Sequence, residues 1–184
     1  MAPIDRRPGI RPRPTLGRRL DIAARAGFPA CITILLMLLT QAPLGPAGQA
    51  TLLPAVAFSS VWFWSLFRPE TFPPPIVFMI GLLLDLLGYL PPGAGVFTLL
   101  AVQGVALALR RGLPSRGFAW IWLVFGMVAC AASVLIWLLV MLLDFRLLPP
   151  QPAMLMAVLS VAIYPVLAVP FARAHRSVAN PEDA

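Results

Sequence analysis

Six apolar stretches alternate along the chain with short polar or proline-rich segments. They cover approximately residues 26–44, 52–67, 75–90, 96–109, 118–143 and 153–172. Apolar runs of this kind, separated by turn-forming residues, are typical of helices that cross a lipid bilayer. The pattern therefore predicts an all-α membrane protein, folded as a six-transmembrane-helix bundle.

The runs differ in length, and their ends define the expected organisation of the chain. The fifth run is long enough to cross the bilayer at a tilt, whereas the second to fourth are short. The short runs can span only if flanking residues extend them or the bundle thins the bilayer locally. We expect an Arg/Pro-rich tail over residues 1–25, a transmembrane domain over 26–172 and a second tail over 173–184.

The composition excludes a soluble protein. Of the 184 residues, 60% are hydrophobic and only 11% are charged, whereas about a quarter are charged in an ordinary soluble domain. Every one of the 14 basic residues is arginine. A strongly basic chain can indicate nucleic-acid binding, but these arginines lie outside the apolar runs. Membrane orientation and anionic lipid headgroups explain that placement better, so we expect no nucleic-acid partner.

The distribution of arginine predicts how the chain is oriented. With the N-terminus in the cytoplasm, only Arg146 falls on the outer side. This asymmetry follows the positive-inside rule and places both termini in the cytoplasm. Trp62, Trp64, Trp120 and Trp122 then lie near the cytoplasmic face, as expected for an aromatic belt.

An alternative for the first run is a cleaved signal peptide, with Gly48-Gln-Ala50 as the small-residue cleavage site. The charged leader is long for a signal and the run is nearly long enough to span. We therefore interpret residues 26–50 as retained. The other five helices keep the same orientation in either case.

Asp85 is the acidic residue that lies deep inside an apolar run. It lies about 15 Å along a helix that begins near Pro75. A carboxylate at such a depth costs about 2.5–3.5 kcal/mol on insertion scales, so it should face protein or a wet cavity, or be protonated. Gly81, Asp85 and Gly88 share one helix face, where glycines allow a neighbouring helix to approach closely.

Two interpretations of Asp85 remain open from the sequence. The carboxyl group contacts a coupling ion, a substrate or a partner, or it makes an internal hydrogen bond that locks a helix pair or caps the outer loop. Arg146 is the only basic residue near the outer face that could pair with Asp85.

Small residues also form a patch on the fifth helix, at Gly126, Ala129, Cys130 and Ser133. The patch serves packing within the chain or docks a helix of another protein. Cys31 and Cys130 both lie in apolar runs, where we expect them to behave as small buried hydrophobic residues.

Pro165 and Pro170 predict a kink in the last helix, with Tyr164 beside it. The one histidine, His175, has no acid or cysteine near it that would suggest catalysis. No spacing of metal ligands, phosphate-binding loop or nucleophile motif is present. We therefore expect neither an enzyme nor a bound cofactor.

Several of these residues together resemble the rod shape-determining protein MreD family. The resemblance rests on Pro54, Phe63-Trp64, Pro69, the Gly81-Leu-Leu-Leu-Asp85 element, Gly93 eight residues after the acid, and Tyr164-Pro165. By motif it covers about a third of the chain, and by layout nearly all of it. Gly88 and the pair Pro91-Pro92 depart from the family pattern, which leaves open the geometry of the loop after Asp85.

The resemblance implies a non-enzymatic scaffold or regulatory subunit of the bacterial cell-elongation complex, in the inner membrane. Its partners would be an MreC-like single-span protein, RodA with a penicillin-binding transpeptidase, and indirectly MreB. The family is also similar in fold to the S components of energy-coupling transporters. That similarity implies an alternative, a transporter subunit that binds a small molecule, with Asp85 lining an outward-facing pocket. The expected interface residues are Gly81, Asp85, Gly88, Gly93, Gly126, Cys130 and Pro165.

Overall fold

The computed structural model describes the backbone of residues 16–42, 49–145 and 147–179, and the side chains of 27–42, 51–145 and 147–173. These parts of the chain are helical and contain no strand, which confirms the predicted all-α class. The elements are α1 (Leu16–Leu39), α2 (Gln49–Phe67), a short 3-10 turn η1 (Pro69–Thr71), α3 (Pro74–Gly88), α4 (Ala94–Leu109), α5 (Phe118–Asp144) and α6 (Gln151–Ala179).

The first and last helices extend into the segments predicted as tails. α1 begins at Leu16, well before the apolar run, and ends at Leu39 rather than at residue 44. Residues 16–28 contain no proline, and arginine and alanine favour helix. The helix of the apolar run therefore extends back through this polar segment. α6 likewise continues to Ala179. Residues 43–48, including Gly48 of the possible cleavage site, lie outside the described residues.

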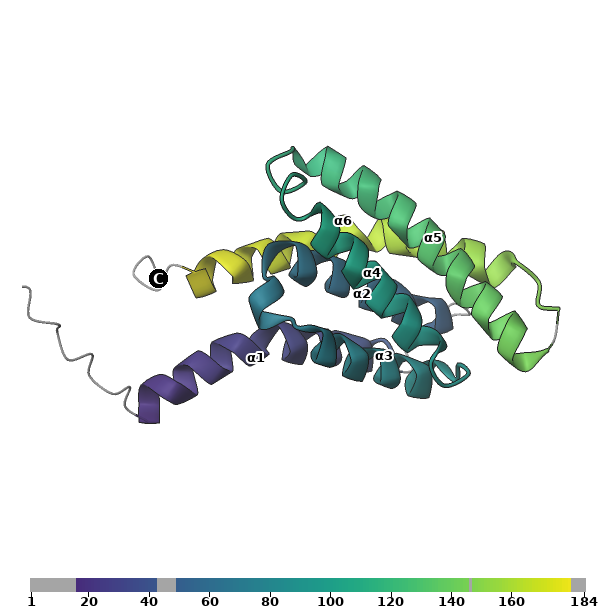
Figure 1. Ribbon diagram of the computed structural model, residues 1–184, viewed down its shortest axis with the longest axis horizontal. Coiled ribbons are helices and arrows are strands. Elements are labelled where there is room, and N and C mark those ends of the chain that lie inside the picture. Colours follow the sequence, from purple (N-terminus) through teal and green to yellow (C-terminus); the bar gives the residue numbers. More distant parts are fainter. Residues whose placement is uncertain (1–15, 43–48, 146, 180–184) are drawn as a thin grey trace, which may run out of the picture.

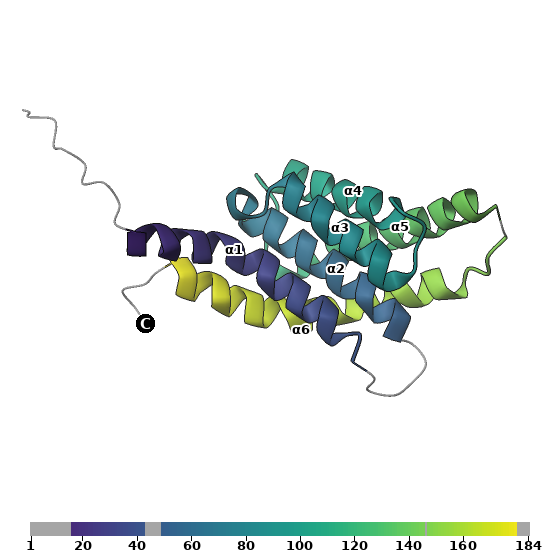
Figure 2. The ribbon, with the colours of Figure 1, turned by 90° about the horizontal axis from the view of Figure 1, so that it is seen from below.

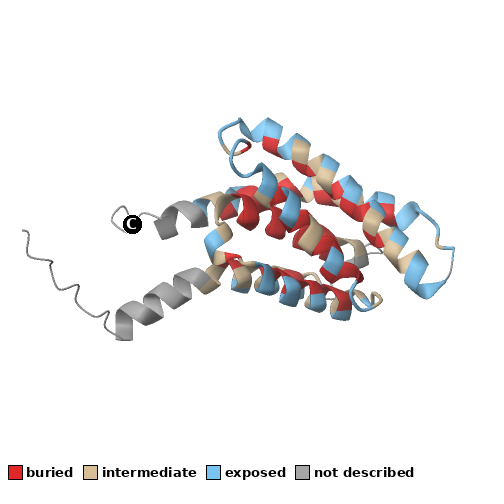
Figure 3. Ribbon diagram, viewed as in Figure 1, coloured by how far each residue is buried: buried red, intermediate tan, exposed pale blue. Residues whose placement is uncertain are grey.

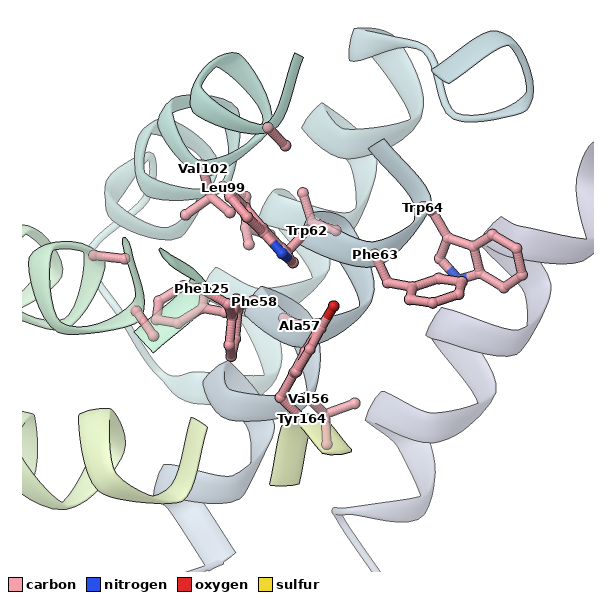
Figure 4. Close-up of a cluster of buried hydrophobic side chains, with 14 of the residues drawn as sticks. Val56, Ala57, Phe58, Trp62, Phe63, Trp64, Leu99, Val102, Phe125 and Tyr164 are labelled. Atoms are coloured by element: carbon pink, nitrogen blue, oxygen red, sulfur yellow. The ribbon is translucent and has the colours of Figure 1, made fainter. Parts of the chain in front are cut away.

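α2 runs through the centre of the bundle. It packs against α1, α3, α4 and α6, and every side chain from Leu53 to Leu66 is buried. Figure 4 shows its aromatic residues in contact with those of α5 and α6; the rings of Trp62 and Phe125, for example, lie 5.9 Å apart. A helix that is apolar on all sides is suited to this central position because no face of it meets water.

The buried position of α2 corrects the predicted aromatic belt. Trp62 and Trp64 are 0% and 1% exposed, so both rings belong to the core and not to an interfacial belt. Trp120 and Trp122, near the start of α5, are exposed. Position in the sequence predicted the same depth in the membrane for all four tryptophans, but only Trp120 and Trp122 lie on the surface of the bundle.

The outer surface of the bundle is also apolar. Figure 3 shows buried residues along the inner faces of the helices and exposed ones along the outer faces. The exposed residues include large hydrophobic side chains such as Met79, Leu86, Met127 and Val158. Cys31 and Cys130 also lie on this surface as free thiols, so the expectation that they are buried was wrong.

Among the helices with described side chains, two are long and apolar enough to cross a membrane: α5 and the Gln151–Arg173 part of α6. The apolar parts of α1, α2, α3 and α4 are shorter, each between 10 and 17 residues. This measure rests on helix length and apolar composition alone.

The chain turns at two ends of an elongated bundle. Figures 1 and 2 place the beginning of α1, the turn at η1, the α4–α5 turn and the end of α6 at one end. The α3–α4 and α5–α6 turns lie at the opposite end. All arginines with a described side chain belong to the first end, namely Arg68, Arg110, Arg111, Arg116 and Arg173.

Candidate functional site: the Asp85 junction

The carbonyl group of Asp85 accepts the hydrogen bonds that close the last turn of α3. Tyr89 adopts a left-handed conformation (φ 51°) and its N–H donates a hydrogen bond to the carbonyl oxygen of Asp85. The N–H of Leu90 donates to the same oxygen at 3.0 Å. A left-handed residue just past a helix end is a common helix stop, because it turns the next N–H groups back toward the last carbonyls. Here the stop allows α4 to begin only a few residues later.

The side chain of Asp85 holds the start of α4. The backbone N–H of Gly93 donates to Oδ2 at 2.8 Å, and that of Gly95 donates to Oδ1 at 2.5 Å. The N-cap residue of α4 is Gly93, which has no side chain to cap the helix. The first N–H groups of a helix have no partner within it, and a carboxyl group there also suits the positive end of the helix dipole. Asp85 therefore caps α4 from a different helix.

Glycines at two positions allow this approach. A Cβ atom on Gly81 would lie 2.5 Å from the Cα of Val96, and a Cβ on Gly95 would collide with the carboxyl oxygen of Asp85. At Gly81 the obstacle is backbone, which cannot move aside, and at Gly95 it is the carboxyl group that caps α4, so this packing requires glycine at both positions. Gly88 differs, since a Cβ there would meet Leu90 and Leu53 at 3.4 and 3.7 Å.

The structure thus brings together Gly81, Asp85 and Gly93, three of the residues singled out in the sequence. Asp85 is 4% exposed and faces protein. The internal hydrogen bond that the sequence allowed is present, and it caps the start of α4. Gly93 adopts φ 98°, a conformation that favours glycine. Arg146, the proposed ion-pair partner, lies outside the described residues.

Sequence reasoning missed Gly95. The signal was available, because Gly93-Ala94-Gly95 directly follows Pro91-Pro92, at the place where a helix would start. It also missed Gln103, which is buried and donates from Nε2 to the carbonyl oxygen of Phe72 at 2.9 Å. This bond fastens α4 to the segment that precedes α3.

A cavity of about 260 Å³ lies at the same end of the bundle. Its lining comes from α2, the end of α3, α5 and α6, and is almost entirely apolar; it includes Thr51, Pro54, Gly88, Leu90, Ile136, Trp137 and Met156. Asp85 is not among its lining residues, because both carboxyl oxygens are directed at α4. The predicted pocket lined by Asp85 is therefore not the cavity found here.

The small residues of α5 divide between two faces of the helix. Ala129 and Ser133 point inward, and the hydroxyl of Ser133 donates to the carbonyl oxygen of Ala129 at 2.8 Å. Gly126 and Cys130 instead line an outward groove of about 590 Å³ together with Trp122, Leu123, Met127 and Val161. The Trp122 indole bridges the two helices of the groove by donating to the carbonyl oxygen of Val161 at 2.9 Å.

The last helix remains helical through both prolines. Tyr164, directly before Pro165, is buried and stacks on Phe125 with ring centroids 4.4 Å apart. Its aromatic ring therefore belongs to the core around α2, while the kink at Pro165 and Pro170 stays a prediction. Within the described residues, no group of three or more His, Cys, Asp or Glu could hold a metal ion.

Comparison of the chain with models of protein families, with curated proteins and with solved structures finds no match.

Proposed function

We propose that this chain crosses the bacterial inner membrane six times and acts as a non-enzymatic scaffold of the cell-elongation complex, as its resemblance to MreD implies. The observation that carries the proposal is the Asp85 junction. Gly81, Asp85 and Gly93 carry the resemblance as a spacing pattern. In the structure Gly93 donates to the carboxyl group of Asp85, and Gly81 lies against Val96 of α4, so all three take part in the packing of α3 on α4.

The distribution of polarity supports the membrane placement. Large apolar side chains cover the outer faces of the helices, and arginines gather at one end. α3 and α4 are short, with 15 and 16 residues, which corresponds to about 22–24 Å against a hydrocarbon core of about 30 Å. The uncharged α3–α4 turn and a locally thinned bilayer make up the difference.

The groove on α5 and α6 is the surface that best fits a partner helix. Gly126 and Cys130 are small residues that leave room for another helix. Leu123, Met127 and Val161 supply the apolar side chains that line the groove. In a bilayer, helices associate through small residues because lipid offers no hydrophobic driving force between them. We place the single transmembrane helix of an MreC-like partner here, with RodA, its transpeptidase and MreB joining the same complex. Gly81 is unsuited to this role since it packs against Val96.

Co-purification with the MreC-like partner tests this function. Gly126→Leu fills the groove without entering the core, so it should reduce recovery of the partner at least several-fold. Leu86→Trp is the matched control, because Leu86 lies on the exposed face of α3. Undiminished recovery with Gly126→Leu would exclude this groove as the docking surface. Failure of the unaltered chain to recover the partner would count against the scaffold function itself.

The cavity of about 260 Å³ supports a second candidate, a small-molecule-binding subunit of a transporter. Specific small-molecule sites combine an apolar lining with a few convergent polar groups, and Thr51 is the one hydroxyl in this lining. Native mass spectrometry of the purified chain would show a retained small molecule in this case. Ala153→Trp, which fills the cavity, should release that molecule, whereas a chain that carries none would count against the candidate.

A further inference from the structure

A second cavity lies at the arginine-rich end, where α2, α5 and α6 meet. It has a volume of about 240 Å³ and an aromatic floor. Its lining residues are Phe63, Phe67, Phe118, Ile121, Tyr164, Ala168, Val169 and Ala172. Phe118 and Val169 are exposed, so the cavity opens on the lateral surface of the bundle. An apolar cavity of about 150 Å³ can already hold benzene, so this one has room for part of a hydrocarbon chain.

Three arginines lie next to this cavity along the chain. Arg68 directly follows the lining residue Phe67, Arg173 directly follows Ala172, and Arg116 precedes Phe118 by two residues. Three separate segments of the lining therefore each carry an arginine within two residues of a lining residue. The guanidinium carbon of Arg116 lies 5.8 Å from the centre of the Trp120 ring, which keeps its charge at the exposed surface.

Little negative charge balances these cations within the described part of this end. Five arginine side chains are described there, and Glu70 is the one acidic side chain among them. α5 also begins here, and its N-cap residue Gly117 makes no side-chain cap. The free N–H groups at a helix start carry partial positive charge and suit phosphate. This end of the cavity thus favours an anion.

We propose that the cavity binds an anionic phospholipid of the inner leaflet. Part of an acyl chain packs against the aromatic floor, and the phosphate lies among Arg68, Arg116 and Arg173. This inference rests on the membrane placement made under the proposed function. Charge complementarity decides the occupant: an apolar cavity with cations at one end matches a molecule with a hydrocarbon tail and a phosphate head, and basic pockets between helices are known to bind such headgroups. Arginine suits phosphate because its planar fork donates paired hydrogen bonds.

Lipid binding to the purified full-length chain tests the inference. We would compare phosphatidylglycerol with neutral phosphatidylcholine by native mass spectrometry in a neutral detergent. The unaltered chain should retain phosphatidylglycerol preferentially. The double substitution Arg116→Gln with Arg173→Gln should weaken that binding on the order of tenfold or more, since each basic residue near an anionic surface contributes measurably. Arg110→Gln with Arg111→Gln removes the same charge from the same end, at two positions that adjoin no lining residue in the chain, and should leave binding unchanged.

A second pair of variants tests the apolar part of the site. Val169→Trp fills the cavity from its exposed rim and should prevent retention of phosphatidylglycerol. Val166→Trp, on an exposed position of the same helix outside the lining, should not.

Equal retention of the two lipids would overturn the inference. An equal loss of phosphatidylglycerol binding in both double-arginine variants would also overturn it, because the binding would then depend only on the net charge of this end. Either result would leave partner recovery through the Gly126 groove intact, so failure here is distinguishable from failure of the proposed function.

Discussion

Asp85 connects two helices through four hydrogen bonds. Its carbonyl oxygen accepts from Tyr89 and Leu90, and its carboxyl oxygens accept from Gly93 and Gly95. The same residue therefore ends α3 and begins α4. A buried polar group is costly unless it is hydrogen-bonded, and this one is fully engaged.

Removing the carboxyl group should destabilise the chain. Asp85→Ala leaves the N–H groups of Gly93 and Gly95 without a partner, and losing such a cap costs about 0.5–2 kcal/mol. Asp85→Asn keeps one acceptor oxygen and should cost less. Thermal unfolding in detergent would measure both, with Asp144→Asn at the exposed end of α5 as the control. An unchanged midpoint for Asp85→Ala would show that the junction does not support the fold.

Gly81 should not tolerate even a methyl group. Gly81→Ala puts a Cβ 2.5 Å from the Cα of Val96, and overpacking of this kind costs about 1–3 kcal/mol. Gly126→Ala is the matched control in another helix, since its Cβ would lie 3.6 Å from Val161. The control should be neutral or slightly stabilising because alanine favours helix over glycine. Equal stability of the two variants would refute the close approach of α3 and α4.

At this scale the sequence predicted the importance of Asp85 but not its partners. A carboxyl group in an apolar run must face protein or water, which follows from its solvation cost. Which atoms it meets depends on how α4 is placed against α3, and no spacing rule contains that information. Gly81 and Gly93 were found by spacing, whereas Gly95 was missed because its role arises only from the approach of the two helices.

At the scale of elements, α2 is the helix around which the others pack. Its central location was not apparent from the sequence, where it looked like any other apolar run. The positions of Trp62 and Trp64 were predicted from distance along the chain alone, and packing on all sides of α2 placed them in the core. Helix ends were predicted to within a few residues where proline and glycine mark them, as in α3 and α5. They were predicted less well in α1 and α6, which continue into polar segments.

The buried hydroxyls of α2 give a prediction at this scale. Ser60 and Ser65 have buried hydroxyl oxygens without a hydrogen-bond partner. Ser60→Ala should therefore raise the free energy of unfolding by about 1 kcal/mol, because it removes an unsatisfied polar group. Its neighbour Ser59 donates to the carbonyl oxygen of Ala55 at 2.7 Å, so Ser59→Ala should bring no such gain. Thermal unfolding of both variants would decide, and a loss of stability with Ser60→Ala would mean that its hydroxyl has a partner.

At the scale of the whole molecule, the separation of charge and apolar surface is the dominant feature. The described arginines lie at one end, and large apolar side chains are exposed along the helices between the two ends. Composition and run lengths predicted this arrangement because they depend on the solvent and not on packing details. The groove at Gly126 and the cavity at the arginine-rich end required the structure, since each is formed by residues from different helices.

The most direct test of the account is the side of the membrane on which each end of the bundle lies. A single cysteine would be introduced by Ser115→Cys in the α4–α5 turn or by Leu147→Cys in the α5–α6 turn, with Cys31 and Cys130 replaced by alanine. Both positions are exposed. In intact spheroplasts, a membrane-impermeant maleimide should label the Leu147→Cys variant and spare the Ser115→Cys variant until the membrane is opened. Labelling of the Ser115→Cys variant in sealed spheroplasts would contradict the proposed topology.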